Sequence, residues 1–233
     1  MKGGDKLSPA CAECVVNASE KACRVPGGRG PVFCPTRNLT EAIGRAVSRY
    51  ADPEVREFAR QASIQEAECY INRSAKPAVR HPVKPRLQEI CEFARRMGFR
   101  RLGLAYCAGL QAEAAQLAKV LEAHGYEVVS VACKVGCVAK EQIGISDEQK
   151  VRVGEFESMC NPIAQAEILN EAKTDFNIVL GLCVGHDSLF FMHARAPTTV
   201  FAVKDRVLGH NPLAAIYTLG SYYERFAAAG RPR

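Results

Sequence analysis

The fold of this protein is decided by one stretch of its sequence, Asn177-Ile-Val-Leu-Gly-Leu-Cys-Val-Gly-His-Asp-Ser-Leu-Phe190. Its apolar run, residues 178–182, leads into Cys183, His186 and Asp187. A run that is apolar at every position is typical of a strand buried on both faces, as in a parallel sheet. Ligands of open α/β sheets bind beyond the carboxyl ends of the strands, so these three polar side chains stand where a ligand would bind.

Two other predicted strands also run into cysteine. Residues 101–106 precede Cys107, and residues 126–132 precede Cys133, with Cys137 one loop further on. Together with a helical pattern at 111–124 and a last strand at 198–203, this alternation predicts an α/β fold with a parallel, Rossmann-like or flavodoxin-like sheet. We therefore expect the cysteines to meet at one edge of that sheet. A final helix is predicted over 213–226.

Cys160 stands directly before another predicted helix. Asn161 can cap this helix and Pro162 can occupy its first turn, and a helix N-terminus stabilises a thiolate. Four or five thiols at one crevice suit a soft metal centre, an iron–sulfur cluster or zinc. The predicted ligands are Cys107, Cys133, Cys160 and Cys183, with Cys137 as a further candidate because the choice between it and Cys133 stays open.

A second group of cysteines lies near the N-terminus. Residues 1–38 contain a C-x-x-C pair and two later cysteines in a segment rich in Gly and Pro. Four thiolates around a metal would substitute for the core that this segment lacks. Zinc and an iron–sulfur cluster are both compatible with the spacing, and four unrelated thiols are the alternative. The predicted ligands are Cys11, Cys14, Cys23 and Cys34.

The rest of the chain divides into two parts. Residues 39–84 are predicted to form a helical segment and a linker, and residues 85–233 the α/β domain with the second cysteine site. Segment 73–86 carries five basic residues and three prolines. We interpret it as a solvated linker and expect no nucleic-acid contact, because the aromatic residues that stack on bases are missing beside it.

Cys69 and Cys91 lie on apolar helical stripes and are expected to pack as small hydrophobes.

The composition of the chain indicates the cellular compartment in which the protein is expected to reside. The 233 residues include 11 cysteines, the net charge is +6, and the polar start has no signal-peptide core. No apolar run is long enough to span a bilayer, so we expect a cytoplasmic protein without membrane contact. Disulfides are disfavoured in a reducing compartment, which points the cysteines toward metal or redox chemistry.

Several polar residues at the expected sheet edge are candidates for chemistry. His186 and His210 could ligate a metal or transfer a proton, and otherwise are hydrogen-bonded corner residues. Asp187 could orient a histidine or cap a helix, and Lys204 could attract an anionic cluster or substrate or form a surface ion pair. No Walker loop or GxGxxG fingerprint supports nucleotide binding.

Three long motifs resemble a known family. They are CNPIAQAEILN (160–170), GLCVGHDSLF (181–190) and VKDRVLGHNPLAA (203–215). In these motifs the chain resembles the uncharacterised prokaryotic "metal-binding protein" family, domain of unknown function 1847. The resemblance implies metal binding and supplies no reaction.

These observations favour a metal-binding protein whose edge centre is an iron–sulfur cluster, [4Fe-4S] in the favoured form, acting in redox or sulfur chemistry on a small molecule. A non-catalytic zinc protein of metal handling or regulation, and an electron-transfer protein, are the alternatives. Whether the protein is an enzyme, its substrate or redox partner and its oligomeric state stay open.

Overall fold

A computed structural model describes residues 8–74 and 80–227. The chain divides into two compact units, Met1–Ile64 and Gln65–Arg233, and each is described by itself. The polar start (residues 1–7) and part of the expected linker (residues 75–79) lie outside the described residues. Within the described ranges, no helix has both the length and the apolar character of a membrane span.

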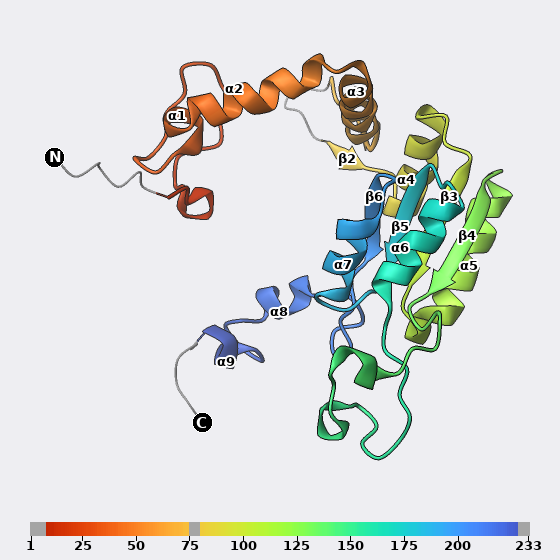
Figure 1. The fold of residues 1–233 in the computed structure, drawn as a ribbon. Helices are drawn as coiled ribbons and strands as arrows, with labels where there is room; N and C mark the ends of the chain where they lie inside the picture. Colours follow the sequence, from red (N-terminus) through yellow and green to blue (C-terminus); the bar gives the residue numbers. More distant parts are fainter. Residues whose placement is uncertain (1–7, 75–79, 228–233) are drawn as a thin grey trace. The chain divides into compact units, whose positions relative to one another are not determined.

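The second unit is built on a four-stranded sheet in the order β4-β3-β5-β6 (Figure 1). Every neighbouring pair is parallel, which confirms the predicted fold class. All five residues of β5 are buried, as the uninterrupted apolar run indicates. The strands are β3 (Arg101–Tyr106), β4 (Glu127–Ala132), β5 (Phe176–Leu180) and β6 (Thr198–Ala202).

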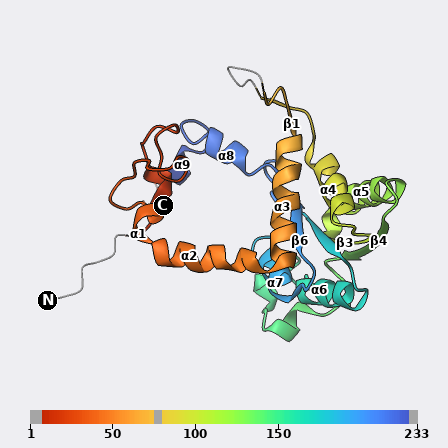
Figure 2. The same cartoon turned by 90° about the horizontal axis from the view of Figure 1, so that it is seen from above.

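Helices cover both faces of this sheet. Seen from above, α4 and α5 lie on one face and α6 and α7 on the other (Figure 2). The chain leaves β3 toward β4 and then crosses back over β3 to β5, so the order of winding reverses between β3 and β5. Ligands of such sheets bind at this reversal, beyond the carboxyl ends of the strands. The helices are α4 (Arg86–Arg96), α5 (Gln111–Ala123), α6 (Pro162–Glu171) and α7 (His186–His193).

The core of the second unit is formed by side chains from the sheet and from both helix layers. Leu104, Leu169, Ile178 and Phe190 have no exposed surface. Gly103 is required at its position, because a Cβ there would collide with the side chain of its strand neighbour Asn177. The parallel sheet is therefore packed closely enough to hold its strand ends in defined positions.

The first unit has a different character. Among residues 8–64 none is buried, and α2 exposes apolar side chains such as Ile43 and Val47. This agrees with the expectation that the N-terminal segment has little core of its own. The unit contains a 3₁₀ turn (Cys11–Glu13), α1 (Pro35–Asn38), α2 (Thr40–Ser48), a second 3₁₀ turn (Arg49–Ala51) and most of α3 (Pro53–Glu68).

Two segments differ from the sequence-based expectation. The expected linker is partly paired, because β1 (Tyr70–Ile71) and β2 (His81–Pro82) form a short antiparallel ladder. The expected helix 213–226 is broken into α8 (Leu213–Tyr217) and α9 (Glu224–Ala227). Thr218 and Gly220 lie at the break, and β-branched residues and glycine both disfavour helix continuation.

Candidate functional site

The strand ends bring three of the cysteines to one edge of the sheet. Cys107 directly follows β3 and Cys133 directly follows β4. Their amides continue the ladder, since Cys107 N donates to Leu180 O at 3.0 Å and Cys133 N to Tyr106 O at 2.9 Å. Cys183 lies just beyond β5 and its carbonyl accepts the amides that begin α7. The segment between β4 and α6, green in Figure 1, extends beyond this same edge.

The start of α6 adds the fourth cysteine. Asn161 caps the helix by accepting the Ala164 amide at 3.1 Å, and Pro162 occupies the first turn, as the sequence predicts. The Asn161 amide donates to Cys133 O at 2.7 Å, so the residue after Cys160 is fastened to the end of β4. Cys160 is thereby placed beside Cys133.

A buried glutamine secures this arrangement. Gln165 has no exposed surface, and its amide nitrogen donates to Val131 O at 2.7 Å and to Tyr106 O at 3.2 Å. These carbonyls stand just before Cys133 and Cys107. Its Oε1 has no hydrogen-bond partner within the described residues. One α6 side chain therefore bridges the ends of β3 and β4.

The thiols of Cys133 and Cys160 act on each other. The hydrogen bond from the Cys133 thiol and, to a smaller extent, the Lys134 ammonium lower the pKa of Cys160 to about 7, against the opposing effect of burial. The same hydrogen bond, together with burial, raises the pKa of Cys133. Cys107 and Cys183 both act on Cys160 as well, in the opposite direction. Cys160 is thus the thiol of this pair that ionises first.

Cations stand beside the remaining thiols. Arg206 Nη2 donates to Cys183 Sγ at 3.1 Å, and this sulfur raises the pKa of the guanidinium. Cys107 and Cys160 act on the same guanidinium in the same direction. The edge therefore joins the thiols of Cys107, Cys133, Cys160 and Cys183 into one interacting group, here called the cysteine tetrad.

The other candidates differ in their surroundings. Burial and then Lys134 lower the pKa of His186 and keep its imidazole neutral at neutral pH. Asp187 Oδ1 accepts the Ser188 amide at 2.8 Å within the first turn of α7. His210 Nδ1 accepts the Asp205 amide at 3.1 Å and so stabilises its own loop. The charges of Lys134, Asp187 and Arg206 therefore act on the His186 imidazole.

No mononuclear metal site is preformed within the described ranges of the chain. All eleven cysteines fall in the described residues and are free thiols. Among residues 8–74 and 80–227, no three His, Cys, Asp or Glu side chains form a group that could hold a metal ion. This holds for the tetrad and for the N-terminal group, whose members are exposed or half-buried: Cys11, Cys14, Cys23 and Cys34. Metal binding at these residues stays a prediction.

Three cysteines lie apart from the tetrad. Cys137 is exposed and has a left-handed backbone conformation (φ 49°). Cys69 is buried, and its thiol donates to Gln65 O at 3.1 Å. Cys91 is 2% exposed, and burial raises its pKa. These surroundings match the expectation that Cys69 and Cys91 pack as hydrophobes.

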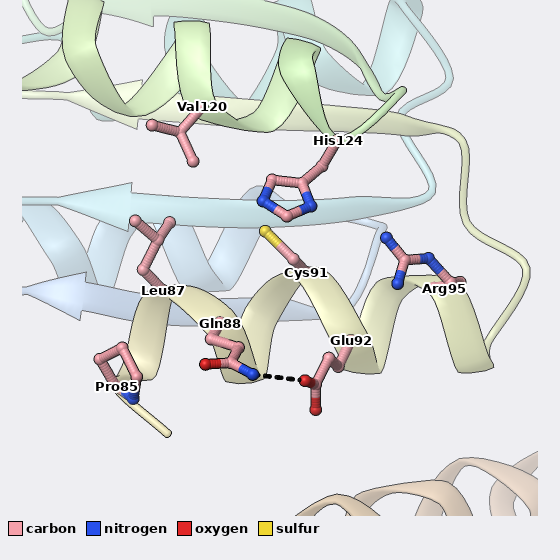
Figure 3. A pocket seen from close by; sticks show the side chains of 8 residues that line it. All are labelled: Pro85, Leu87, Gln88, Cys91, Glu92, Arg95, Val120 and His124. Atoms are coloured by element: carbon pink, nitrogen blue, oxygen red, sulfur yellow. Dashed lines mark hydrogen bonds between the residues drawn. The ribbon is translucent and has the colours of Figure 1, made fainter. Parts of the chain in front are cut away.

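Cys91 lines a shallow cavity between α4 and α5, where its sulfur points toward His124 (Figure 3). Glu92, on the same wall, accepts a hydrogen bond from Gln88 at 2.8 Å. His124 and Arg95 lie at helix ends that lead into β4 and β3, at the amino edge of the sheet. The cavity is therefore separate from the cysteine tetrad.

Two contributors were missed from the sequence. Lys134 directly follows the predicted ligand Cys133, and this position in the sequence was the available sign of its role. Gln165 precedes Leu169 by four residues on the apolar side of α6, and a polar residue at a core position was the available sign.

Comparison with known proteins relates this chain to a protein family and to an archaeal protein. The family model "Protein of unknown function (DUF1847)" matches residues 34–201. An uncharacterized protein of Methanocaldococcus jannaschii is 48% identical over 168 residues, which is 72% of this chain and 81% of the relative.

Among solved structures, Dph2 from Pyrococcus horikoshii, one of them with a 4Fe-4S cluster, resembles this chain with a TM-score of 0.34 and 18% identity. The match covers 64% of this chain and 34% of Dph2, so the chain spans about a third of that protein's length. Similarity of that degree carries no functional information. The family match and the M. jannaschii relative show that this chain belongs to the DUF1847 family.

Proposed function

We propose that this protein holds an iron–sulfur cluster, [4Fe-4S] in the favoured form, on its cysteine tetrad and serves redox or sulfur chemistry on a small molecule. The observation that carries the proposal is the meeting of four thiols from four separate segments at the edge where the sheet reverses its winding.

The donor set fits such a group. Four sulfurs are the ligands of thiophilic centres. A single tetrahedral zinc requires all four sulfurs within about 4 Å of one another, since Zn–S bonds are about 2.3 Å long. A cluster spreads its four ligands over several irons, so each sulfur binds a different metal atom. We favour a cluster over zinc because four thiols from separate segments meet at this edge.

The chain's own residues have separate tasks. Cys107, Cys133, Cys160 and Cys183 would hold the group, which when bound would supply one-electron chemistry. Arg206 donates to the Cys183 sulfur and places positive charge beside ligands that are negative when ionised. Gln165 and the Asn161 amide hold the strand ends and α6 together.

His186 can take part in proton transfer. Its pKa is lowered by burial and by Lys134, so at neutral pH it is a neutral imidazole with one nitrogen able to accept a proton. Asp187 opposes this shift and so limits it. We assign His186, rather than His210, the proton-transfer role.

The N-terminal group supports a second candidate function, zinc binding without catalysis. Residues 8–64 bury no side chain, so a metal held by Cys11, Cys14, Cys23 and Cys34 would supply the missing core. Zinc there would serve structure, metal handling or regulation. Both sites need reduced thiols, which suits a cytoplasmic location.

Anaerobic purification followed by iron, zinc and acid-labile sulfide analysis and a visible spectrum tests the proposal. Iron and sulfide should fall in Cys107→Ser, Cys133→Ser, Cys160→Ser and Cys183→Ser. The matched controls Cys69→Ala and Cys91→Ala should keep them. A colourless wild-type protein without iron, or equal loss in the two controls, would overturn the edge cluster.

A further inference from the structure

Two cations at the cysteine edge have no carboxylate partner within the part of the chain that the structure describes. Lys204 and Arg206 follow β6, and among the described residues no carboxylate lies within ion-pair distance of either. The Arg206 guanidinium donates to the Cys183 sulfur. A cation without a carboxylate partner attracts a negative ligand.

The backbone brings Lys204 to the tetrad. Its amide donates to Leu182 O at 3.2 Å, which keeps the chain beside β5 after β6 has ended. A side-chain carbon built on Gly109 would lie 3.7 Å from Lys204 Nζ and 3.8 Å from Cys107 Sγ. The ammonium and the sulfur therefore face one point above Gly109, and the missing side chain leaves that point open.

The acid between the two cations is directed elsewhere. Asp205 Oδ1 accepts the amides of Val207 at 3.0 Å and Leu208 at 2.8 Å, which folds its carboxylate into its own loop. The loop therefore separates the Asp205 carboxylate from the side chains of its neighbours Lys204 and Arg206. Asp205 structures the turn, while neither Lys204 nor Arg206 pairs with a carboxylate among the described residues.

We infer that the cysteine edge binds a small anion, a carboxylate or an oxyanion of phosphorus or sulfur, between Lys204 and Arg206. The guanidinium offers paired N–H donors that match such oxygens, and the ammonium adds a point charge. That this anion is the substrate of the metal centre rests on the proposed function. The anion site itself does not require a bound metal.

A pair of alkylating reagents tests the site in metal-free, reduced protein. Iodoacetate is an anion and iodoacetamide is its neutral counterpart, and in both a thiolate sulfur displaces iodide to form a thioether. The ratio of their rates at Cys107 and Cys183, read by peptide mass spectrometry, cancels any change in thiol ionisation. It reports the charge that the approaching reagent meets.

Lys204→Gln and Arg206→Gln should each lower the iodoacetate-to-iodoacetamide ratio by about threefold or more, the effect of one unit charge about 6 Å away even at the dielectric constant of water. Lys119→Gln, on the exposed side of α5, is the matched control and should leave the ratio unchanged. At constant ionic strength, sulfate should slow iodoacetate in the wild-type protein more than iodoacetamide.

Equal ratios in all three variants, with no selective effect of sulfate, would overturn the anion site. Because the assay uses metal-free protein, its result is separate from the metal analysis. Iron and sulfide without anion preference would leave the proposed function standing and reject this inference. Anion preference in a protein that holds no iron would support the anion site and reject the proposed iron–sulfur function.

Discussion

The reactivity of Cys160 follows from its hydrogen bond with Cys133. In the metal-free protein, the pKa of Cys160 is about 7, against 9.0 for an ordinary thiol. At neutral pH this gives about 50 times more thiolate, while the lower basicity reduces intrinsic nucleophilicity about eightfold. Iodoacetamide should therefore modify Cys160 about six times faster than it modifies a free thiol of pKa 9, such as an acetylated cysteine in the same solution.

The assay is the rate of iodoacetamide modification at Cys160 as a function of pH, followed by peptide mass spectrometry. In the wild-type protein, the rate should reach half its plateau near the pKa of about 7. Cys133→Val removes the thiol that donates to Cys160 and leaves burial to dominate, so the midpoint should move upward. Cys133→Ser keeps a donor on a similar side chain and should keep most of the shift.

Two results would refute this reasoning. A wild-type midpoint near that of a free thiol would show that Cys133 does not stabilise the Cys160 thiolate. An unchanged midpoint in Cys133→Val would assign the shift to another cause, such as the α6 N-terminus or Lys134. In either case, the two thiols would not act as a coupled pair.

Three further predictions concern stability. Gln165→Leu loses two hydrogen bonds, at about 0.5–1.5 kcal/mol each, but also removes a buried unpaired oxygen worth about 1–3 kcal/mol, so urea unfolding should show little change. Gln165→Ala adds a cavity and should cost about 2 kcal/mol or more, and equal losses in both variants would contradict the role of the unpaired oxygen. Gly103→Ala places a Cβ against Asn177 and should cost about 1–3 kcal/mol in thermal unfolding. The control Gly44→Ala, where a Cβ meets open space within α2, should be neutral or stabilising, and a harmless Gly103→Ala would show that the sheet is less tightly packed than described. Burial raises the pKa of Glu92, but hydrogen bonds from Lys84, Gln65 and Gln88 outweigh it and lower the value from 4.5 to about 2. The folded pKa lies below the unfolded one, so this stability is present above pH 4.5 and is lost as the pH falls toward about 2. The stability difference between wild type and Glu92→Gln should shrink across that window in urea titrations, and a constant difference would contradict the assignment.

The sequence alone was sufficient for the sheet and for its cysteine-bearing edge. The apolar run that became β5 predicted a strand buried on both faces, and the strand–helix–strand alternation predicted parallel pairing. These patterns can be read from residues close along the chain. Helical crossovers join parallel strands, and parallel strands have their carboxyl ends at the same edge of the sheet. Cys107, Cys133 and Cys183 follow from that rule without any tertiary information.

Only the tertiary structure decided which polar groups act together. Cys133 is buried and interacts with Cys160, whereas Cys137 is exposed after a turn in which Gly136 and Cys137 have left-handed conformations. Sequence spacing does not reveal such a turn.

The tertiary structure also decided the partners of the charged residues after β6 and of the buried Gln165. Asp205 is turned into its loop and Arg206 onto a sulfur 23 residues away, although the two are neighbours in sequence. Gln165 reaches two carbonyls of different strands. Secondary structure depends on residues close along the chain, whereas these contacts join segments that meet only after the sheet and its helices have packed.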